Sequence, residues 1–250
     1  PRRRRRARLS ARPEAVTSEL VYGRRPVREL LRGPREVLEL WATERALRAE
    51  AWLGEAPVRV QRKPERDLTV EASTADHQGV LARAEPYRYA DAYELASGPA
   101  PLLAVLDSVT DPRNLGAVIR SAEGAGASGV VLPAHNAARV TPAVCRASAG
   151  AVEHLPVAVV KNLSRYLGEV KSQHLWLWAA DGSAEKSMWQ ADLSGGVALV
   201  FGAEGKGLRP LVRRACDDSV AIPLAGRVES LNVSVAAALL LYEARRQRGG

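Results

Sequence analysis

Residues 102–125 read LLAVLDSVTDPRNLGAVIRSAEGA and contain a complete strand, turn and helix. Leu102 to Leu106 form a continuous apolar run, which is typical of a strand that is covered on both faces. Asp107 to Pro112 is polar and predicts a turn, and a helix is predicted from Asn114 to Ala125, with Gly126 just past its end. Units of this kind build a mostly parallel sheet with crossover helices, so the stretch predicts an α/β fold.

The chain beyond this unit continues the alternation of strand-like and helix-like segments. A new helix is predicted to start at Thr141 and Pro142, and a long apolar helix is predicted over about residues 232–247. In such sheets, ligands bind where loops leave the carboxyl ends of the strands, so the residues after each strand are the first candidates for a site. The other predicted strands are Val130–Leu132, Leu155–Val160, Leu175–Ala179 and Val197–Phe201.

The part of the chain before this sheet predicts a separate, smaller domain. Short strand-like and helix-like stretches fill residues 19–87, among them a helix over Glu44–Leu53 that Thr43 is placed to cap. Residues 88–101 end in Ser-Gly-Pro-Ala-Pro and have the composition of a linker. We therefore expect a small domain, a linker and a larger domain over residues 102–250.

The positive charge of the chain is concentrated at its N-terminal end. The formal net charge is +8, and residues 1–12 hold seven arginines and no acid, which leaves 29 basic against 28 acidic residues elsewhere. An arginine run this dense repels itself and has little to bury, so we expect residues 1–18 to be a disordered tail. Such a tail gains affinity for phosphates by releasing counterions, although a merely solvated extension explains it equally well.

Other patterns exclude several classes of protein. The longest apolar run is Val235 to Tyr242, far short of the roughly 20 residues that a membrane span needs, and residues 1–12 lack the apolar core of a secretory signal. We therefore expect a soluble, cytoplasmic protein with no membrane partner. Cys145 and Cys216 form no CxxC or Cys/His cluster, and the four histidines have no ligand spacing, so neither a disulfide framework nor a metal site is predicted.

Two segments that follow strands hold unusual polar residues. In the first, Asp107 to Ala122, Asn114 lies at the junction of turn and helix, and Arg120 lies less than two helical turns further on. In the second, FGAEGKGLRP at residues 201–210, three glycines within six residues surround Glu204. This spacing matches neither GxxxxGK[ST] nor GxGxxG, so neither a phosphate loop nor an ordinary dinucleotide site is predicted.

A third segment, AIPLAGRVESLNVSVAA at residues 221–237, leads into the long apolar helix. Ser230, Asn232 and Ser234 offer more helix-capping groups than one helix start needs. Each segment alone has an ordinary explanation as a turn or a cap. Their joint occurrence in this order is much more specific.

Together the segments match DPxNxGxxxRxA, GxExxG and IPxxGxxxSLNVSxAxxxxLYE, and the chain therefore resembles the SpoU/TrmH branch of the SPOUT methyltransferases. The resemblance implies a small domain similar to ribosomal protein L30e over residues 19–87, which binds the RNA substrate. It further implies an α/β methyltransferase domain over residues 102–250 with a C-terminal trefoil knot, which fold rules alone do not predict. It also implies a homodimer, S-adenosylmethionine as the methyl donor, and no metal.

The same resemblance implies the site residues. Gly202, Ile222 and Leu231 match positions whose main-chain groups hold the adenosine part of the donor. Asn114, Arg120, Glu204 and Asn232 match polar positions at the reacting centre, and Ser230 is a weaker candidate there.

The implied reaction is attack of a ribose 2′-hydroxyl of RNA on the sulfonium methyl group, with a guanosine of 23S rRNA as the target in the most similar subgroup. A guanidinium with a pKa above about 12 is a poor general base. We therefore expect Arg120 mainly to bind the target phosphate and stabilise the developing alkoxide. Two alternatives are a tRNA 2′-O-methyltransferase of the same branch and a non-catalytic RNA-binding scaffold. The extra domain before residue 100 favours rRNA over tRNA.

Overall fold

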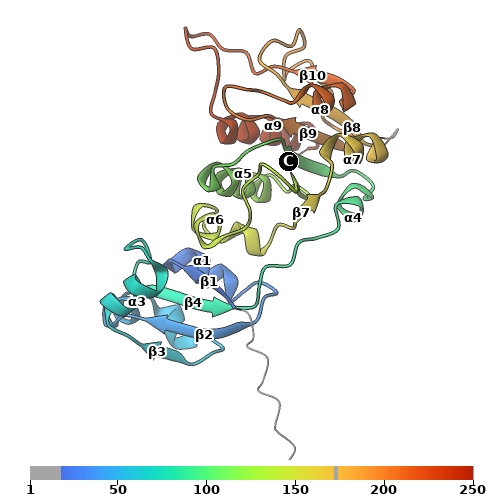
Figure 1. Ribbon diagram of the computed structural model, residues 1–250. Helices are drawn as coiled ribbons and strands as arrows, with labels where there is room; N and C mark the ends of the chain where they lie inside the picture. Colours follow the sequence, from blue (N-terminus) through green and yellow to red (C-terminus); the bar gives the residue numbers. More distant parts are fainter. Residues whose placement is uncertain (1–17, 172–173, 250) are drawn as a thin grey trace, which may run out of the picture.

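The computed structural model describes residues 18–171 and 174–249. The predicted arginine-rich tail therefore lies outside the described residues, except for Ser18. Figure 1 shows two lobes that follow one another along the chain, a smaller lobe in blue and cyan and a larger lobe from green to red. No described helix is long and apolar enough to cross a membrane, and the described residues include no acidic, histidine or cysteine cluster that could hold a metal ion.

The smaller lobe contains a four-stranded sheet with the strand order β1-β4-β2-β3. β4 runs antiparallel to both of its neighbours, whereas β3 runs parallel to β2. The strands are β1 (Glu19–Tyr22), β2 (Val37–Ala42), β3 (Val60–Arg62) and β4 (Val80–Ala84), and the helices are α1 (Arg24–Leu30), α2 (Glu44–Ala49) and α3 (Glu65–Ala72), with a 3-10 turn η1 (Ala51–Glu55).

Thr43 caps α2 as predicted, because its side chain accepts a hydrogen bond from the Ala46 N–H. The predicted end of this helix at Leu53 is wrong. Glu50 adopts an extended backbone, with φ −125° and ψ 92°, so α2 ends at Ala49 and the chain continues as η1.

The larger lobe contains a six-stranded sheet with the order β10-β8-β9-β5-β6-β7, and all its strand pairs are parallel. The predicted α/β fold with a parallel sheet is therefore confirmed, while the trefoil knot stays a prediction. The strands are β5 (Leu102–Leu106), β6 (Gly129–Pro133), β7 (Val157–Val160), β8 (Trp176–Ala180), β9 (Val197–Phe201) and β10 (Asp218–Val220).

Helices cover both faces of this sheet, as the apolar run of β5 predicts. Every residue of β5 is buried, and alternate residues belong to two separate apolar clusters. Leu102, Ala104 and Leu106 pack with α5 (Pro112–Gly124), α6 (Pro142–Ala147) and α9 (Val233–Gln247). Leu103 and Val105 pack with α7 (Leu163–Val170) and α8 (Pro210–Ala215) on the other face.

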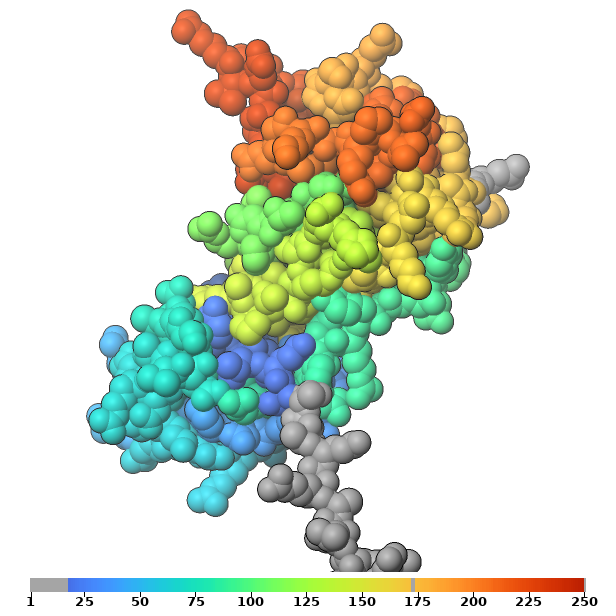
Figure 2. Space-filling view, in the orientation of Figure 1, coloured from blue at the N-terminus to red at the C-terminus, as the bar shows by residue number. Residues whose placement is uncertain are grey.

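The two lobes are in direct contact, as the space-filling view in Figure 2 shows. Residues 88–101, which were predicted to be a linker, contain a short helix α4 (Ala92–Ala96). Just before it, the Ala90 N–H donates a hydrogen bond to the Val157 carbonyl oxygen at 2.9 Å, so this segment pairs with the start of β7. The 3-10 turn η2 (Ala151–Glu153) of the larger lobe packs against α1 of the smaller lobe.

Candidate active site

A pocket of about 280 Å³ lies at the carboxyl ends of β8, β9 and β10. Its wall is built by the turn after β8, by the glycine-rich loop after β9 and by residues 220–236, which lead from β10 into α9. This is the edge of a parallel sheet at which ligands generally bind. Five of the predicted site residues line the pocket, namely Gly202, Glu204, Ile222, Ser230 and Leu231.

The glycine-rich loop folds back on itself. The Gly207 N–H donates a hydrogen bond to the Ala203 carbonyl oxygen at 2.8 Å, and a Cβ atom on Gly202 would lie only 2.1 Å from the Gly207 carbonyl carbon. Gly205 and Gly207 have φ values of +74° and +64°, which side chains rarely tolerate. The loop therefore requires its glycines, and they bring the backbone close to whatever the pocket holds.

An ion pair between a buried carboxylate and a half-exposed arginine anchors the C-terminal end of this loop. Asp107, which directly follows β5, is fully buried, and its carboxylate accepts hydrogen bonds from the Arg209 backbone N–H at 2.9 Å and from the Arg209 Nε at 2.7 Å. The Ser108 hydroxyl also donates to this carboxylate, at 3.2 Å. Sequence reasoning missed this pair, although an acid directly after a buried strand and an arginine directly after a glycine loop were both visible.

The lining of the pocket combines apolar side chains with acidic ones. Its apolar lining includes Phe201, Ile222 and Leu240, and the charged residues among the described lining are Asp181, Glu204 and Glu229, all of them acidic. Hydrogen bonds from the Ser183 hydroxyl and N–H lower the pKa of Asp181, so this carboxyl group stays ionised at neutral pH. The arrangement suits a ligand with a flat apolar part and a positively charged part.

Asn114 and Asn232 lie outside this lining but contact each other. The Asn232 Nδ2 donates a hydrogen bond to the Asn114 Oδ1 at 3.0 Å, which joins the start of α5 to the start of α9. The Asn232 Oδ1 accepts hydrogen bonds from the Ser234 N–H at 2.9 Å and from the Ser234 hydroxyl at 2.6 Å. The surplus of capping groups therefore has a structural use, because Asn232 caps α9 and holds α5 at the same time.

Arg120 is exposed on α5 and does not line the pocket. Within the described residues its guanidinium makes no hydrogen bond and no ion pair. A helix rotates by about 100° per residue, so Arg120 points roughly 120° away from Asn114. A single chain thus brings seven of the eight predicted residues to the pocket or to the helix ends beside it, and leaves Arg120 on an open face.

Comparison with known proteins gives matches along most of the chain. The family described as "SpoU rRNA Methylase family" matches residues 101–242, and the family described as "RNA 2'-O ribose methyltransferase substrate binding" matches residues 20–90.

Individual relatives match nearly the whole chain. A protein of Synechocystis named "Uncharacterized tRNA/rRNA methyltransferase slr0955" is 40% identical over 92% of this chain, which spans 63% of that relative's length. The "23S rRNA (guanosine-2'-O-)-methyltransferase RlmB" of Vibrio vulnificus is 38% identical over 93% of this chain and 98% of its own length. The crystal structure of the SpoU methyltransferase AviRb from Streptomyces viridochromogenes in complex with AdoMet is 28% identical and has a TM-score of 0.76, covering 93% of this chain and 91% of AviRb.

Proposed function

Because the chain belongs to the SpoU rRNA methylase family, we propose that it transfers the methyl group of S-adenosylmethionine to a ribose 2′-hydroxyl of RNA, at a guanosine of 23S rRNA. The observation that carries this proposal is the glycine-rich pocket at the carboxyl ends of β8, β9 and β10, lined by all three residues expected to hold the donor. An rRNA substrate agrees with the expected cytoplasmic location.

The pocket fits the donor chemically. The apolar wall around Ile222 and Leu231 suits the adenine ring, and the carboxylates of Asp181 and Glu204 suit the positive sulfonium and ammonium groups. When bound, the donor supplies an electrophilic methyl group on sulfur. We propose that main-chain groups at Gly202, Ile222 and Leu231 hold the adenosine part.

The chain's own residues would then orient the ribose and stabilise charge. The displacement forms the bond between the 2′-oxygen and the methyl carbon, breaks the bond from that carbon to sulfur, and releases the hydroxyl proton. Positioning of the hydroxyl in line with the methyl group supplies much of the acceleration in this one-step reaction. The guanidinium of Arg120 has no partner within residues 18–171 and 174–249, so we propose that it binds the target phosphate and stabilises the developing alkoxide. Asn114 and Asn232 form a hydrogen-bonded pair that would position the ribose, with Ser230 and Glu204 at the pocket wall.

The same proposal includes a homodimer. Val235, Leu239 and Tyr242 repeat at helical spacing along one face of α9 and are 41–50% exposed. The Tyr242 hydroxyl lies against Gly124 at the end of α5, so the apolar strip adjoins the helix that carries Arg120. We propose that a second copy covers this strip, which would bring each Arg120 to the contact between the two copies.

We also propose that residues 19–87 form the RNA-binding domain and residues 102–250 the methyltransferase domain. The domain before residue 100 favours rRNA over tRNA as the substrate. Arg120, which has no partner in the part of the chain that the structure describes, argues against a non-catalytic scaffold, which has no use for it.

The chemical nature of the product tests the proposal. The protein is incubated with S-adenosylmethionine and 23S rRNA, and the RNA is digested to nucleosides and analysed by mass spectrometry. We expect 2′-O-methylguanosine, together with resistance of one phosphodiester bond to alkaline cleavage. A methyl group on a base, or no new nucleoside, would contradict the proposal.

A further inference from the structure

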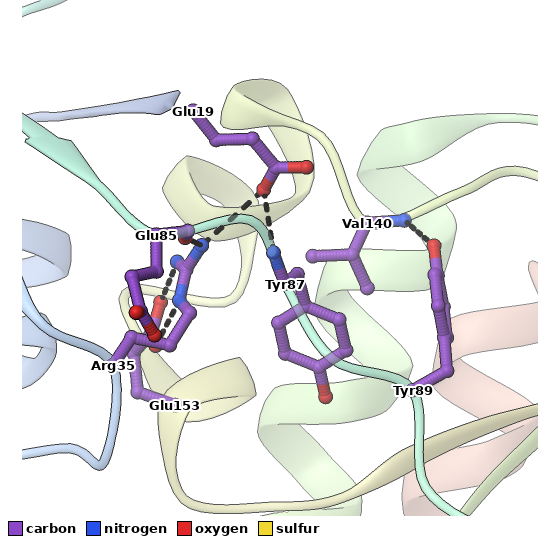
Figure 3. Close-up of polar contacts among 7 residues, drawn as sticks. All are labelled: Glu19, Arg35, Glu85, Tyr87, Tyr89, Val140 and Glu153. Atoms are coloured by element: carbon purple, nitrogen blue, oxygen red, sulfur yellow. Dashed lines mark hydrogen bonds and ion pairs between the residues drawn. The ribbon is translucent and has the colours of Figure 1, made fainter. Parts of the chain in front are cut away.

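The two lobes are joined by a buried ion pair between Arg35 and Glu153, shown in Figure 3. Arg35 follows α1 in the smaller lobe, and Glu153 ends η2 in the larger lobe. The Arg35 Nε donates to Glu153 Oε2 at 2.9 Å and its Nη2 donates to Oε1 at 2.5 Å, so the pair is bidentate. Only 6% of the Arg35 side chain and 1% of the Glu153 side chain is exposed.

Arg35 also contacts Glu19, Glu85 and Tyr87, which lie in the smaller lobe or at the start of the segment that leads to the larger lobe. Its Nη1 donates to the Glu19 carboxylate at 3.3 Å and to the Glu85 carbonyl oxygen at 3.2 Å. The guanidinium carbon lies 5.6 Å from the centre of the Tyr87 ring, within the range of a cation–π contact. Burial lowers the pKa of Arg35, but the hydrogen bond and negative charge of Glu153 outweigh it, so the net pKa is raised and the guanidinium stays charged.

The segment that leads from one lobe to the other is held against the larger lobe. The Val157 N–H donates a hydrogen bond to the Tyr87 hydroxyl at 3.2 Å. The Val140 N–H donates to the Tyr89 hydroxyl at 3.0 Å (Figure 3). With the backbone bond of Ala90, three successive contacts fix residues 87–90 on the methyltransferase sheet and its surroundings. These hydrogen bonds hold residues 87–90 against the larger lobe, directly after the Glu85 carbonyl group that Arg35 contacts.

Close packing surrounds the ion pair. A Cβ atom on Gly33 would lie 2.9 Å from the Glu153 Cβ, and a Cβ atom on Gly150 would lie 2.6 Å from the Glu29 Cβ. The Glu29 carboxylate also contacts the His154 ring at 2.9 Å. At both glycines the two lobes therefore pack so closely that a larger side chain would collide with the other lobe.

This chemistry favours one orientation of the two lobes. A rotation that separates Arg35 from Glu153 would leave a buried charge without a partner, which costs free energy. The planar guanidinium further restricts the geometry because its two parallel hydrogen bonds must both be kept.

We propose that Arg35 is a positioning residue that selects the methylated nucleotide. By holding Glu153, it keeps the RNA-binding domain in one orientation relative to the donor pocket, so that the separation between the bound RNA and the reacting centre determines which ribose is presented. This inference rests on the proposed function for the identity of the substrate, but not for the orientation itself.

The first test measures the orientation directly. Spin labels are placed at Val70→Cys on α3 and Leu211→Cys on α8, which are 78% and 62% exposed in the parent protein. The native Cys145 and Cys216 are buried, and burial raises the pKa of each thiol to about 12, so neither competes for the label. The labelled protein is diluted into an excess of unlabelled protein, so that the measured distances arise within one chain. Pulsed dipolar spectroscopy should then give one narrow distance distribution for the parent and a broad one for the double variant Arg35→Met/Glu153→Met.

The double variant removes both charges at once, which avoids leaving one of them buried and unpaired. Thermal melting of the double variant checks that it is folded. Arg165→Met serves as the matched control, because it removes an exposed arginine whose partner Glu169 lies in the same helix, α7. Its distance distribution should equal that of the parent.

The second test measures selectivity. The affinity for S-adenosylmethionine should stay within about twofold of the parent, because the pocket is not touched. kcat/KM for 23S rRNA should fall about 10- to 100-fold, which is typical of a small misplacement of reacting groups. Methyl groups should also appear at further positions of the RNA.

A broad distribution in the parent, or an unchanged one in the double variant, would overturn the inference. So would a broadened distribution with unchanged kcat/KM and an unchanged methylation site. If the parent methylates no RNA, the proposed function fails, and the spin-label distances still decide whether Arg35 fixes the orientation.

Discussion

Arg120 and Arg209 are two arginines near the proposed site with opposite environments. Arg209 is held by a buried carboxylate behind the glycine-rich loop, whereas the guanidinium of Arg120 has no partner among the described residues. A guanidinium that is hydrogen-bonded to a neighbouring carboxylate stabilises the local structure. A surface guanidinium without such a partner is available to bind a ligand. Replacement of Arg120 should therefore lower the rate of methyl transfer, whereas replacement of Arg209 should weaken binding of S-adenosylmethionine.

Arg120→Lys keeps the positive charge but loses the planar pair of donors. We expect kcat for methyl transfer to fall on the order of 100-fold, as for the loss of one stabilising donor at a reacting centre. The Kd for S-adenosylmethionine should not change, since Arg120 does not line the pocket. Steady-state kinetics and calorimetry measure both quantities, and near-parental turnover would show that the bidentate role is wrong.

Arg209→Gln should instead weaken the binding of S-adenosylmethionine. The loop loses its charged hydrogen bond to Asp107 but keeps the backbone hydrogen bond, so it loosens without unfolding. We expect the Kd for S-adenosylmethionine to rise about tenfold, in line with the loss of one hydrogen bond to a charged group. Arg165→Gln on α7 is the control for removing a paired arginine, and equal affinities for both variants would refute a role for Asp107 in holding the loop.

The elements that sequence patterns predicted best are those with strong local signals. β5 is a pure apolar run, Thr43 caps α2, and the helix predicted over residues 232–247 is α9, whose N-cap is Asn232. The sequence did not predict β10, because a strand of three residues, two of them polar, is too short to show the alternation of polar and apolar residues that marks a strand. The Asp107–Arg209 pair was missed because its partners are 102 residues apart, and no local pattern reports such a contact.

The packing of α5 against α6 depends on a glycine within the helix. A Cβ atom on Gly116 would lie 2.4 Å from the Ala147 Cβ and 2.9 Å from the Ser148 backbone nitrogen, so the two helices must separate to accept it. We expect Gly116→Ala to lower the free energy of unfolding by about 1–3 kcal/mol, as overpacking generally does. Denaturant unfolding gives this value.

Gly168→Ala provides the matched comparison. Gly168 is exposed on α7, and a Cβ atom there would meet no atom within 4 Å. Alanine should therefore raise the free energy of unfolding by about 0.5–1 kcal/mol through its better helix propensity. If both variants were stabilised, the close contact at Gly116 would be refuted.

At the scale of the whole molecule, the two family matches coincide with the two lobes, and the contacts around Arg35 join them. The sequence could indicate two units from the Ser-Gly-Pro-Ala-Pro stretch, but it could not indicate that residues 87–90 pack tightly on the larger lobe. That packing depends on tyrosine hydroxyls meeting backbone N–H groups 51 and 70 residues away.

Leu239→Glu tests the proposed homodimer. A carboxylate in the middle of the apolar strip on α9 would have to be buried without a partner when a second copy docks. We expect the variant to be a folded monomer in sedimentation velocity, at a concentration where the parent sediments as a dimer. Leu211→Glu, which changes an exposed leucine on α8, should leave the parent's state unchanged. A dimeric Leu239→Glu protein would place the interface elsewhere.

The most direct test of RNA 2′-O-methylation at 23S rRNA is methyl transfer from labelled S-adenosylmethionine to 23S rRNA, 16S rRNA and bulk tRNA in parallel, with Arg120→Ala as the control. We expect label in 23S rRNA alone, and its loss in the Arg120→Ala protein. Label in tRNA, or no label in any RNA from a protein that binds S-adenosylmethionine, would contradict the assignment.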